Sequence, residues 1–224
     1  SGLGLLRHDG VDSITSRTGE GALPPEVSSF VNAPRILMIN KSNSISIVHR
    51  PVHMDIVCVK TFDEAGRVKG ERRFVGLFTS AAYNRSPMDI PLLRRRVSRT
   101  IERAGFAPGG HDGKTLLNIL ERFPRDELFQ ISSEELFEMS LAILHLQERQ
   151  RTRLFARSDA YERFVSCLVY VPRDRFNTDL RLRMEAILET AFAGRRSSFT
   201  TQLSDEPLAR IHFIIQTTPG EIPD

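Results

Sequence analysis

The hydrophobic period of this 224-residue sequence changes twice along the chain, and this limits the folds it can adopt. Apolar residues follow strand-like patterns over residues 36–78 and helical spacing over residues 86–150, and they return to strand-like patterns over most of residues 152–216. Alternation predicts strands, whereas recurrence every three to four residues predicts helices. We therefore expect an α+β fold in which antiparallel sheets and helices occupy separate stretches of the chain.

The first 34 residues have no sustained period and are rich in Gly, Ser, Thr and Pro, including Pro24-Pro25. Such a composition is typical of a linker, or of an arm that lies on another surface. The chain begins with Ser1 and carries neither an initial Met nor a charged-then-apolar signal region. We therefore expect it to be a segment cut from a longer protein.

Residues 35–151 are predicted to form an antiparallel sheet followed by a helical module. Turn-forming residues at 40–43 and 63–66 separate strand-like runs, which favours a meander. The four expected strands are residues 36–39, 44–48, 53–59 and 72–78.

Three helices are predicted after residue 86. Gly105 stands where the left-handed carboxyl-terminal cap of the first helix belongs. Asp112 is expected to cap the second helix, which Phe123-Pro124 ends. Ser132 and Glu135 have the spacing of a capping box ahead of the third helix.

Residues 152–224 predict a second module. The expected elements are strands at 152–157 and 161–171, an amphipathic helix at 177–193 closed by Gly194, and strands at 197–203 and 208–216. A buried strand, a helix and two further strands form most of a split βαβ, or ferredoxin-like, unit. A complete copy needs another helix and an edge strand, so we expect a partial βαββ module that is truncated at its C-terminus.

The distribution of charge argues against a nucleic-acid partner, and the short apolar runs argue against a membrane-spanning segment. Basic residues number 31 and acidic residues 28, and almost all of the basic ones are Arg. Because the acids are interspersed among the arginines, we interpret the charged residues of both signs as a mixed solvated surface. Nucleic-acid binding favours a one-sided basic stripe instead. No apolar run approaches the roughly 20 residues that span a bilayer.

Cys58 and Cys167 lie in strand-like apolar runs and are interpreted as small buried hydrophobic residues. Two isolated cysteines without a CxxC spacing predict neither a disulfide framework nor a zinc site. This pattern fits a reducing, cytoplasmic setting.

The string Pro108–Thr115 ends in Gly-Lys-Thr at the start of a predicted helix. A phosphate-cradling loop needs a glycine where Pro108 stands and a buried strand leading into it, and here a helix precedes. We interpret the string as an interhelical turn, so the sequence does not predict nucleotide hydrolysis.

The remaining motifs also predict no catalytic, cofactor or metal residue in this chain. Residues 2–7 begin like a dinucleotide fingerprint but have Arg7 at the third glycine position and no preceding strand. His49 and His53 flank Pro51 in a strand-turn region, so they lack the shared helical face of a zinc pair. Three aspartates near strand ends are assigned ordinary turn and cap roles: Asp159, Asp174 and Asp179.

The stretch 171–178, between the buried strand and the following helix, is the one candidate ligand site. Backbone N–H groups at the helix start, with Arg173 or Arg175 beside them, could hold a carboxylate. The expected site residues are Arg173, Asp174, Asn177 and Thr178. The alternative is a plain capped turn with solvated arginines.

Three strings resemble the large NAD-specific glutamate dehydrogenases of bacteria: residues 153–175, residues 74–80 followed by Tyr83, and residues 199–202 with 208–213. The resemblance implies a position in the long N-terminal region of such an enzyme, which carries ACT-like and PAS-like sensory modules. Residues 152–224 then correspond to an ACT-like module. Residues 35–151 correspond to a PAS-like module or to another ACT-like one.

The resemblance also implies a function. The parent enzyme would deaminate L-glutamate to 2-oxoglutarate and ammonium with NAD as cofactor, using catalytic residues in a later part of its chain. This segment would be regulatory and assembly-forming, with no cofactor of its own. Its expected partners are the other domains of the parent chain, further copies in a homo-oligomer, and an amino-acid effector. A purely structural oligomerisation scaffold is the alternative, and an Arg-rich nucleic-acid-binding module is a less favoured one.

Overall fold

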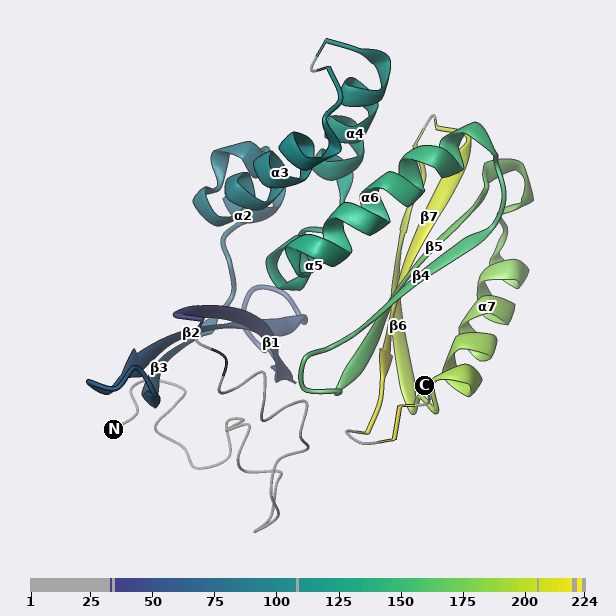
Figure 1. Ribbon diagram of the computed structural model, residues 1–224. Coiled ribbons are helices and arrows are strands. Elements are labelled where there is room, and N and C mark those ends of the chain that lie inside the picture. The colour runs from purple at the N-terminus through teal and green to yellow at the C-terminus, as the bar shows by residue number, and fades with distance from the viewer. Residues whose placement is uncertain (1–32, 34, 108, 205, 219–220, 223–224) are drawn as a thin grey trace. The chain divides into compact units, whose positions relative to one another are not determined.

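A computed structural model describes residues 33, 35–107, 109–204, 206–218 and 221–222 (Figure 1). The expected arm, apart from Ala33, and the string at residues 2–7 lie outside this description. The elements in chain order are β1 (Leu37–Ile45), β2 (His53–Phe62), β3 (Val68–Gly76), α2 (Ser80–Asn84), η2 (Pro87–Asp89), α3 (Pro91–Ala104), α4 (His111–Arg122), α5 (Arg125–Gln130), α6 (Ser133–Glu148), β4 (Arg153–Ser158), β5 (Phe164–Pro172), η3 (Arg173–Arg175), α7 (Thr178–Ala191), β6 (Arg196–Gln202) and β7 (Leu208–Gln216).

These elements form two compact units. The first extends to Leu93 and includes Leu128–Gln130, and the second contains Arg94–Glu127 and the chain from Ile131 onward. The division predicted near residue 151 follows the change of hydrophobic period, whereas the compact units follow spatial proximity. Most of the helical stretch therefore groups with the second sheet.

The first unit contains an antiparallel sheet in the order β1-β2-β3. The prediction of four strands was wrong, because β1 continues through the expected turn at residues 40–43. Its pairing with β2 runs to Lys41 and resumes at Ile45, with a bulge between them. Polar residues that favour turns also suit a bulge, where the extra residues need no partner in the neighbouring strand.

The helix signals were confirmed at two of three places. Gly105 follows α3 with φ +67°, and the Ser132 hydroxyl accepts from the Glu135 N–H (3.1 Å) while the Glu135 carboxylate accepts from the Ser132 N–H (3.0 Å). The cap assigned to Asp112 was wrong, because Gly110 is the N-cap of α4. Asp112 lies in the first turn, where the helix dipole favours a carboxylate.

The second unit contains a four-stranded antiparallel sheet in the order β4-β5-β7-β6. The sequence β5-α7-β6-β7 builds the predicted split unit, since β7 returns between β5 and β6. On the other side of β5 lies β4, the strand predicted at residues 152–157, which occupies the edge position that the prediction left open. The α+β, ferredoxin-like prediction is confirmed, and the edge strand comes from the chain before β5. Truncation at the C-terminus stays a prediction.

The two faces of this sheet differ in chemistry. Figure 1 shows α6 and α7 on opposite sides of it. The face toward α7 is apolar and carries the main core: Val165, Cys167, Val169, Val171, Ala209, Ile211, Phe213 and Ile215, together with Leu188 of α7. The opposite face carries buried polar residues, including Arg157, Ser166 and His212. Eight consecutive residues of β5 are buried, because both faces of the strand are covered.

Gly194 lies at the end of α7, as predicted, and its N–H donates to the Glu189 carbonyl at 2.7 Å. The left-handed conformation at this helix end belongs to Ala193, with φ +50°. Gly194 is needed for a close approach, because a Cβ there would lie 2.3 Å from Cγ2 of buried Ile215. We expect Gly194→Ala to lower the free energy of unfolding by about 1–3 kcal/mol, measured by urea denaturation. Gly109→Ala, with nothing within 4 Å of the added carbon, is the control. Equal losses at both sites would contradict this account.

Candidate functional site

The predicted ligand site lies on an exposed junction between β5 and α7. The η3 turn follows β5 directly, and the Arg173 N–H donates to the Pro207 carbonyl at 2.9 Å. Asn177 is the N-cap of α7, and its Oδ1 accepts from the Leu180 N–H at 2.8 Å. Thr178 begins the helix and is exposed, as are Arg173 and Asp174. The structure thus places the four predicted residues on one short segment.

The junction has the geometry of a capped turn. Asn177 already satisfies one of the N–H groups that a helix start leaves without an intrahelical partner, so fewer remain for a ligand. A binding role for Arg173, Asp174, Asn177 and Thr178 therefore stays a prediction.

A buried polar cluster that the sequence did not indicate lies on the other face of the sheet. Arg157 of β4 donates from Nε and Nη2 to the two carboxylate oxygens of Glu127 in α5, at 2.8 and 3.0 Å. Beside them, Ser166 Oγ lies 2.8 Å from Nε2 of His212, and Glu127 Oε1 lies 3.9 Å from the same nitrogen. All four side chains are buried.

Burial and charge oppose each other at Glu127 and His212. Burial raises the pKa of Glu127, but the charge and hydrogen bonds of Arg157 outweigh it and hold the pKa below its ordinary value. At His212 burial dominates and lowers the pKa, although the Glu127 carboxylate pulls it upward. The cluster is therefore built around an ionised Arg157–Glu127 pair and a neutral imidazole.

Serine, histidine and a carboxylate are the parts of a nucleophilic triad, but their arrangement here does not provide one. In a triad the carboxylate bonds one ring nitrogen and the serine the other. Here Ser166 and Glu127 both lie nearest to Nε2 of His212. Ser166 is also only 2% exposed, so a substrate would not reach its hydroxyl. The cluster instead joins Glu127 to the sheet.

Lowered pKa values make this cluster sensitive to acid. The pKa of His212 is lower in the folded chain than the ordinary value of 6.5, so the unfolded chain takes up a proton at this residue at a higher pH than the folded chain does. The fold therefore loses stability as the pH falls from about 6.5 toward the pKa of folded His212. The Glu127 contribution is lost at still lower pH. We expect the free energy of unfolding, from urea titrations between pH 8 and 5, to fall below about pH 6.5. His212→Gln should flatten this fall, whereas the exposed His111→Gln should not; the same slope in both variants would contradict the assignment.

The cysteines, two histidines and one aspartate singled out in the sequence lie in the core, at the start of a strand or in turns of the fold. Burial raises the pKa of Cys58 to about 11 and that of Cys167 to about 12, so both behave as the predicted buried hydrophobic residues. His49 is exposed in a turn, and Nδ1 of His53 lies 3.0 Å from the Ser42 carbonyl. Asp159 has the expected turn role, accepting from the Tyr161 N–H at 3.2 Å.

The described residues offer neither a metal-ion cluster nor a helix that could span a membrane. In that part of the chain, no three His, Cys, Asp or Glu side chains are grouped so that they could hold a metal ion. Among the described helices, none combines the length and apolar character that crossing a membrane requires.

Two family models match the chain. Residues 153–224 match the ACT2 domain of glutamate dehydrogenase, and residues 90–149 match its helical motif 1. The first match begins at the first residue of β4, and the second covers the chain from just before α3 to one residue past the end of α6.

Curated relatives named NAD-specific glutamate dehydrogenase are similar over most of the chain. The protein of Halomonas elongata is 46% identical over 88% of this chain, and that of Pseudomonas aeruginosa is 42% identical over 85%. The protein of Mycobacterium tuberculosis is 34% identical over 96%. In each case the chain spans 12% of the relative's length.

Proposed function

Because this chain corresponds to a segment of the large NAD-specific glutamate dehydrogenases, we propose that it is a non-catalytic regulatory and assembly segment of such an enzyme. The parent enzyme would convert L-glutamate, NAD and water to 2-oxoglutarate, ammonium and NADH, in the cytoplasm. The observation that carries the proposal is the coincidence of the ACT2 match with the four-stranded sheet and α7. This segment would then respond to a ligand while another part of the parent chain performs the chemistry.

We place the effector at the junction between β5 and α7. The proposed ligand is an amino acid, whose α-carboxylate would lie beside the Arg173 guanidinium and the first N–H groups of α7. Asp174 supplies a carboxylate for an α-ammonium group, and Asn177 and Thr178 supply polar side chains at the helix start. The exposure of this junction leaves it accessible to a small ligand.

Titration calorimetry of the full chain against a panel of amino acids tests this proposal. We expect heat of binding from at least one of them, its loss in Arg173→Ala, and its retention in Arg183→Ala, which removes an exposed arginine elsewhere on α7. Uniformly absent heat would favour a purely structural role. Turnover of glutamate and NAD by this chain alone would overturn its assignment as non-catalytic.

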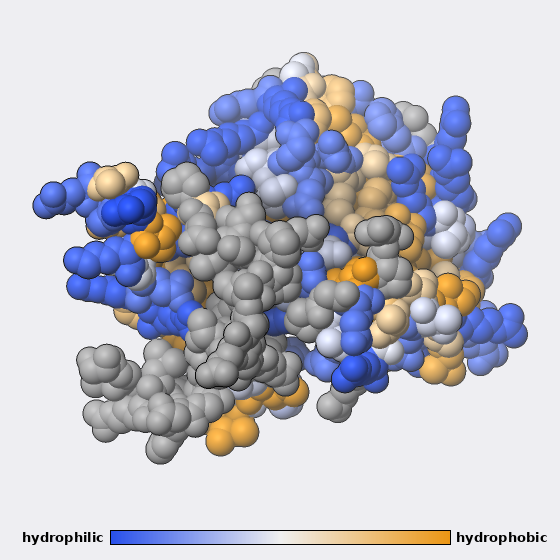
Figure 2. Space-filling view, turned by 60° about the horizontal axis from the view of Figure 1, so that its bottom comes forward, coloured by the Kyte–Doolittle hydropathy of each residue, from blue (hydrophilic) through white to orange (hydrophobic). Residues whose placement is uncertain are grey.

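An assembly role has a specific observation behind it. Large hydrophobic residues on α7, on β6 and just after β6 are exposed: Leu182 (50%), Ile187 (65%), Phe199 (44%) and Leu203 (57%). Figure 2 shows exposed hydrophobic side chains among hydrophilic ones on one face. Exposed apolar surface is typical of interaction sites, so we propose contacts with other parts of the parent chain and with further copies in a homo-oligomer.

The arginines support these partners better than nucleic acid. Several of them pair with acids on the surface, including Arg103 with Glu134 and Arg122 with Glu206. Such pairing leaves a mixed surface and not the one-sided basic stripe that favours a phosphate backbone. We therefore propose no nucleic-acid partner.

A further inference from the structure

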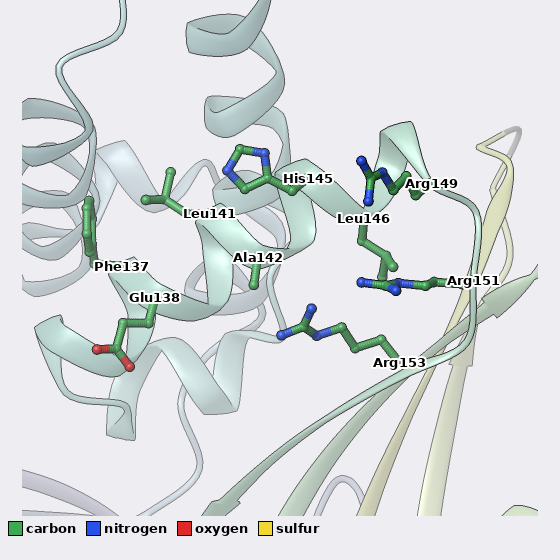
Figure 3. A pocket seen from close by; sticks show the side chains of 9 residues that line it. All are labelled: Phe137, Glu138, Leu141, Ala142, His145, Leu146, Arg149, Arg151 and Arg153. Atoms are coloured by element: carbon green, nitrogen blue, oxygen red, sulfur yellow. The ribbon is translucent and has the colours of Figure 1, made fainter.

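A groove of about 640 Å³ lies along α6 and the stretch that leads from it into β4, within the second compact unit (Figure 3). Its volume falls within the range of small-molecule sites, about 300–1,000 Å³. Its lining residues come from α6, from the connecting stretch and from the start of β4: Phe137, Glu138, Leu141, Ala142, His145, Leu146, Arg149, Arg151 and Arg153.

Three arginines give one end of the groove a concentrated positive charge. Arg149 is the C-cap of α6, Arg153 is the first residue of β4, and Arg151 lies midway along the short stretch between them. All three are exposed, and Figure 3 shows Arg151 and Arg153 extending in the same direction, toward α6. Within the described chain, none of the three guanidinium groups has a carboxylate partner.

The partial negative charge at the carboxyl terminus of α6 is too small to balance three arginines. A helix carboxyl terminus is equivalent to about half a negative charge, which a single guanidinium already exceeds. Among the residues that line the groove, Glu138 alone carries a carboxylate, and it lies about three helical turns before Arg149. Three neighbouring guanidinium groups repel one another, and an anion with several charges would relieve that repulsion.

Apart from Glu138 and His145, the other residues that line the groove are apolar. Phe137, Leu141, Ala142 and Leu146 recur along one side of α6 and form its floor. A ligand that fills the groove therefore has a hydrophobic or flat body and a compact group with more than one negative charge. Phosphate groups match this end best, because their oxygens accept paired hydrogen bonds from guanidinium forks and a single carboxylate would leave two arginines unpaired.

We propose that this groove binds an organic phosphate of nucleotide size, with its phosphates between Arg149, Arg151 and Arg153 and its body along Leu141 and Ala142. The site shares no residue with the amino-acid site proposed at Arg173, so either can fail without the other. It would place a second ligand where the helical stretch joins the sheet.

Titration calorimetry of the full chain with ATP, pyrophosphate, adenosine and citrate tests the proposal. We expect ATP to bind about tenfold more tightly than pyrophosphate, and adenosine not to bind measurably. Arg149→Ala/Arg151→Ala should weaken ATP about tenfold or more. Arg99→Ala/Arg183→Ala, which removes the same charge from exposed positions outside both proposed sites, should leave the affinity within about twofold.

Three results would overturn the proposal: no saturable binding of ATP, an equal loss in both double variants, or citrate binding as tightly as ATP. The first would leave the groove without this ligand, the second would show a general charge effect, and the third would remove the phosphate specificity. Urea denaturation of both double variants verifies that each is folded.

Discussion

Replacing either Arg157 or Glu127 with methionine is expected to lower the free energy of unfolding by about 3–5 kcal/mol. Each single substitution leaves the other charge buried without its partner, and that desolvated charge is the main cost. In Glu127→Met the imidazole of His212 also loses its neighbouring carboxylate. Urea denaturation at low temperature measures the loss for both variants at neutral pH.

The double variant Glu127→Met/Arg157→Met should recover most of that loss. Two well-packed hydrophobic side chains can replace a buried ion pair at little cost, because the desolvation of both charges disappears together. Ser166 and His212 can keep their hydrogen bond to each other. The coupling energy from the four proteins of this cycle measures the pair directly.

A second Arg–Glu pair with similar geometry serves as the control. Arg103 and Glu134 also form a bidentate pair, in which Nη2 of Arg103 donates to Oε1 of Glu134 at 2.7 Å, but both side chains are about half exposed. Solvent screens this pair, so the same cycle should give less than about 1 kcal/mol. Similar coupling energies in the two cycles would show that burial is not what makes the Arg157–Glu127 pair matter.

Phe213→Ala is the second substitution with a large expected effect, about 3–5 kcal/mol. Phe213 is fully buried on β7, in the apolar core between the sheet and α7. Removing the ring withdraws its transfer free energy and leaves a cavity that the neighbouring strands cannot fill. Urea denaturation should show a lower midpoint with an unchanged slope.

The neighbouring ring provides a matched comparison. Phe199 of β6 lies 6.2 Å from Phe213 between ring centroids, yet it is 44% exposed. Phe199→Ala should therefore cost clearly less than Phe213→Ala, since much of its ring already contacts water. If Phe199→Ala proved the more damaging change, the core assigned to the face toward α7 would be misplaced.

Local signals in the sequence predicted much of this fold. The capping box at Ser132 and the left-handed cap at Gly105 depend on residues within one turn, so they could be identified without tertiary contacts. The short helix α5 was missed, because Phe123-Pro124 indicates the end of one helix and only six residues follow before the next break. The bulge in β1 was predicted as a turn, because both use the same polar residues.

Contacts between distant residues explain what the sequence left undetermined. Glu127 and Arg157 are 30 residues apart, and neither lies in a motif with its own signature. The edge position of β4 depends on pairing with β5, which alternation does not specify. The junction at Arg173 could be located because it joins two strongly patterned elements. The arginines at 149–153 were grouped with the mixed surface, because only the folded chain shows that no described carboxylate pairs with them.

The position of β4 determines how this sheet can be divided experimentally. A fragment that began at β5 would contain the whole split βαβ unit yet leave one edge of its most buried strand without hydrogen-bond partners. Unpaired N–H and C=O groups along such an edge are a template for pairing with other chains, so that fragment would aggregate. A fragment that begins at Arg153 keeps β4 in place and protects that edge.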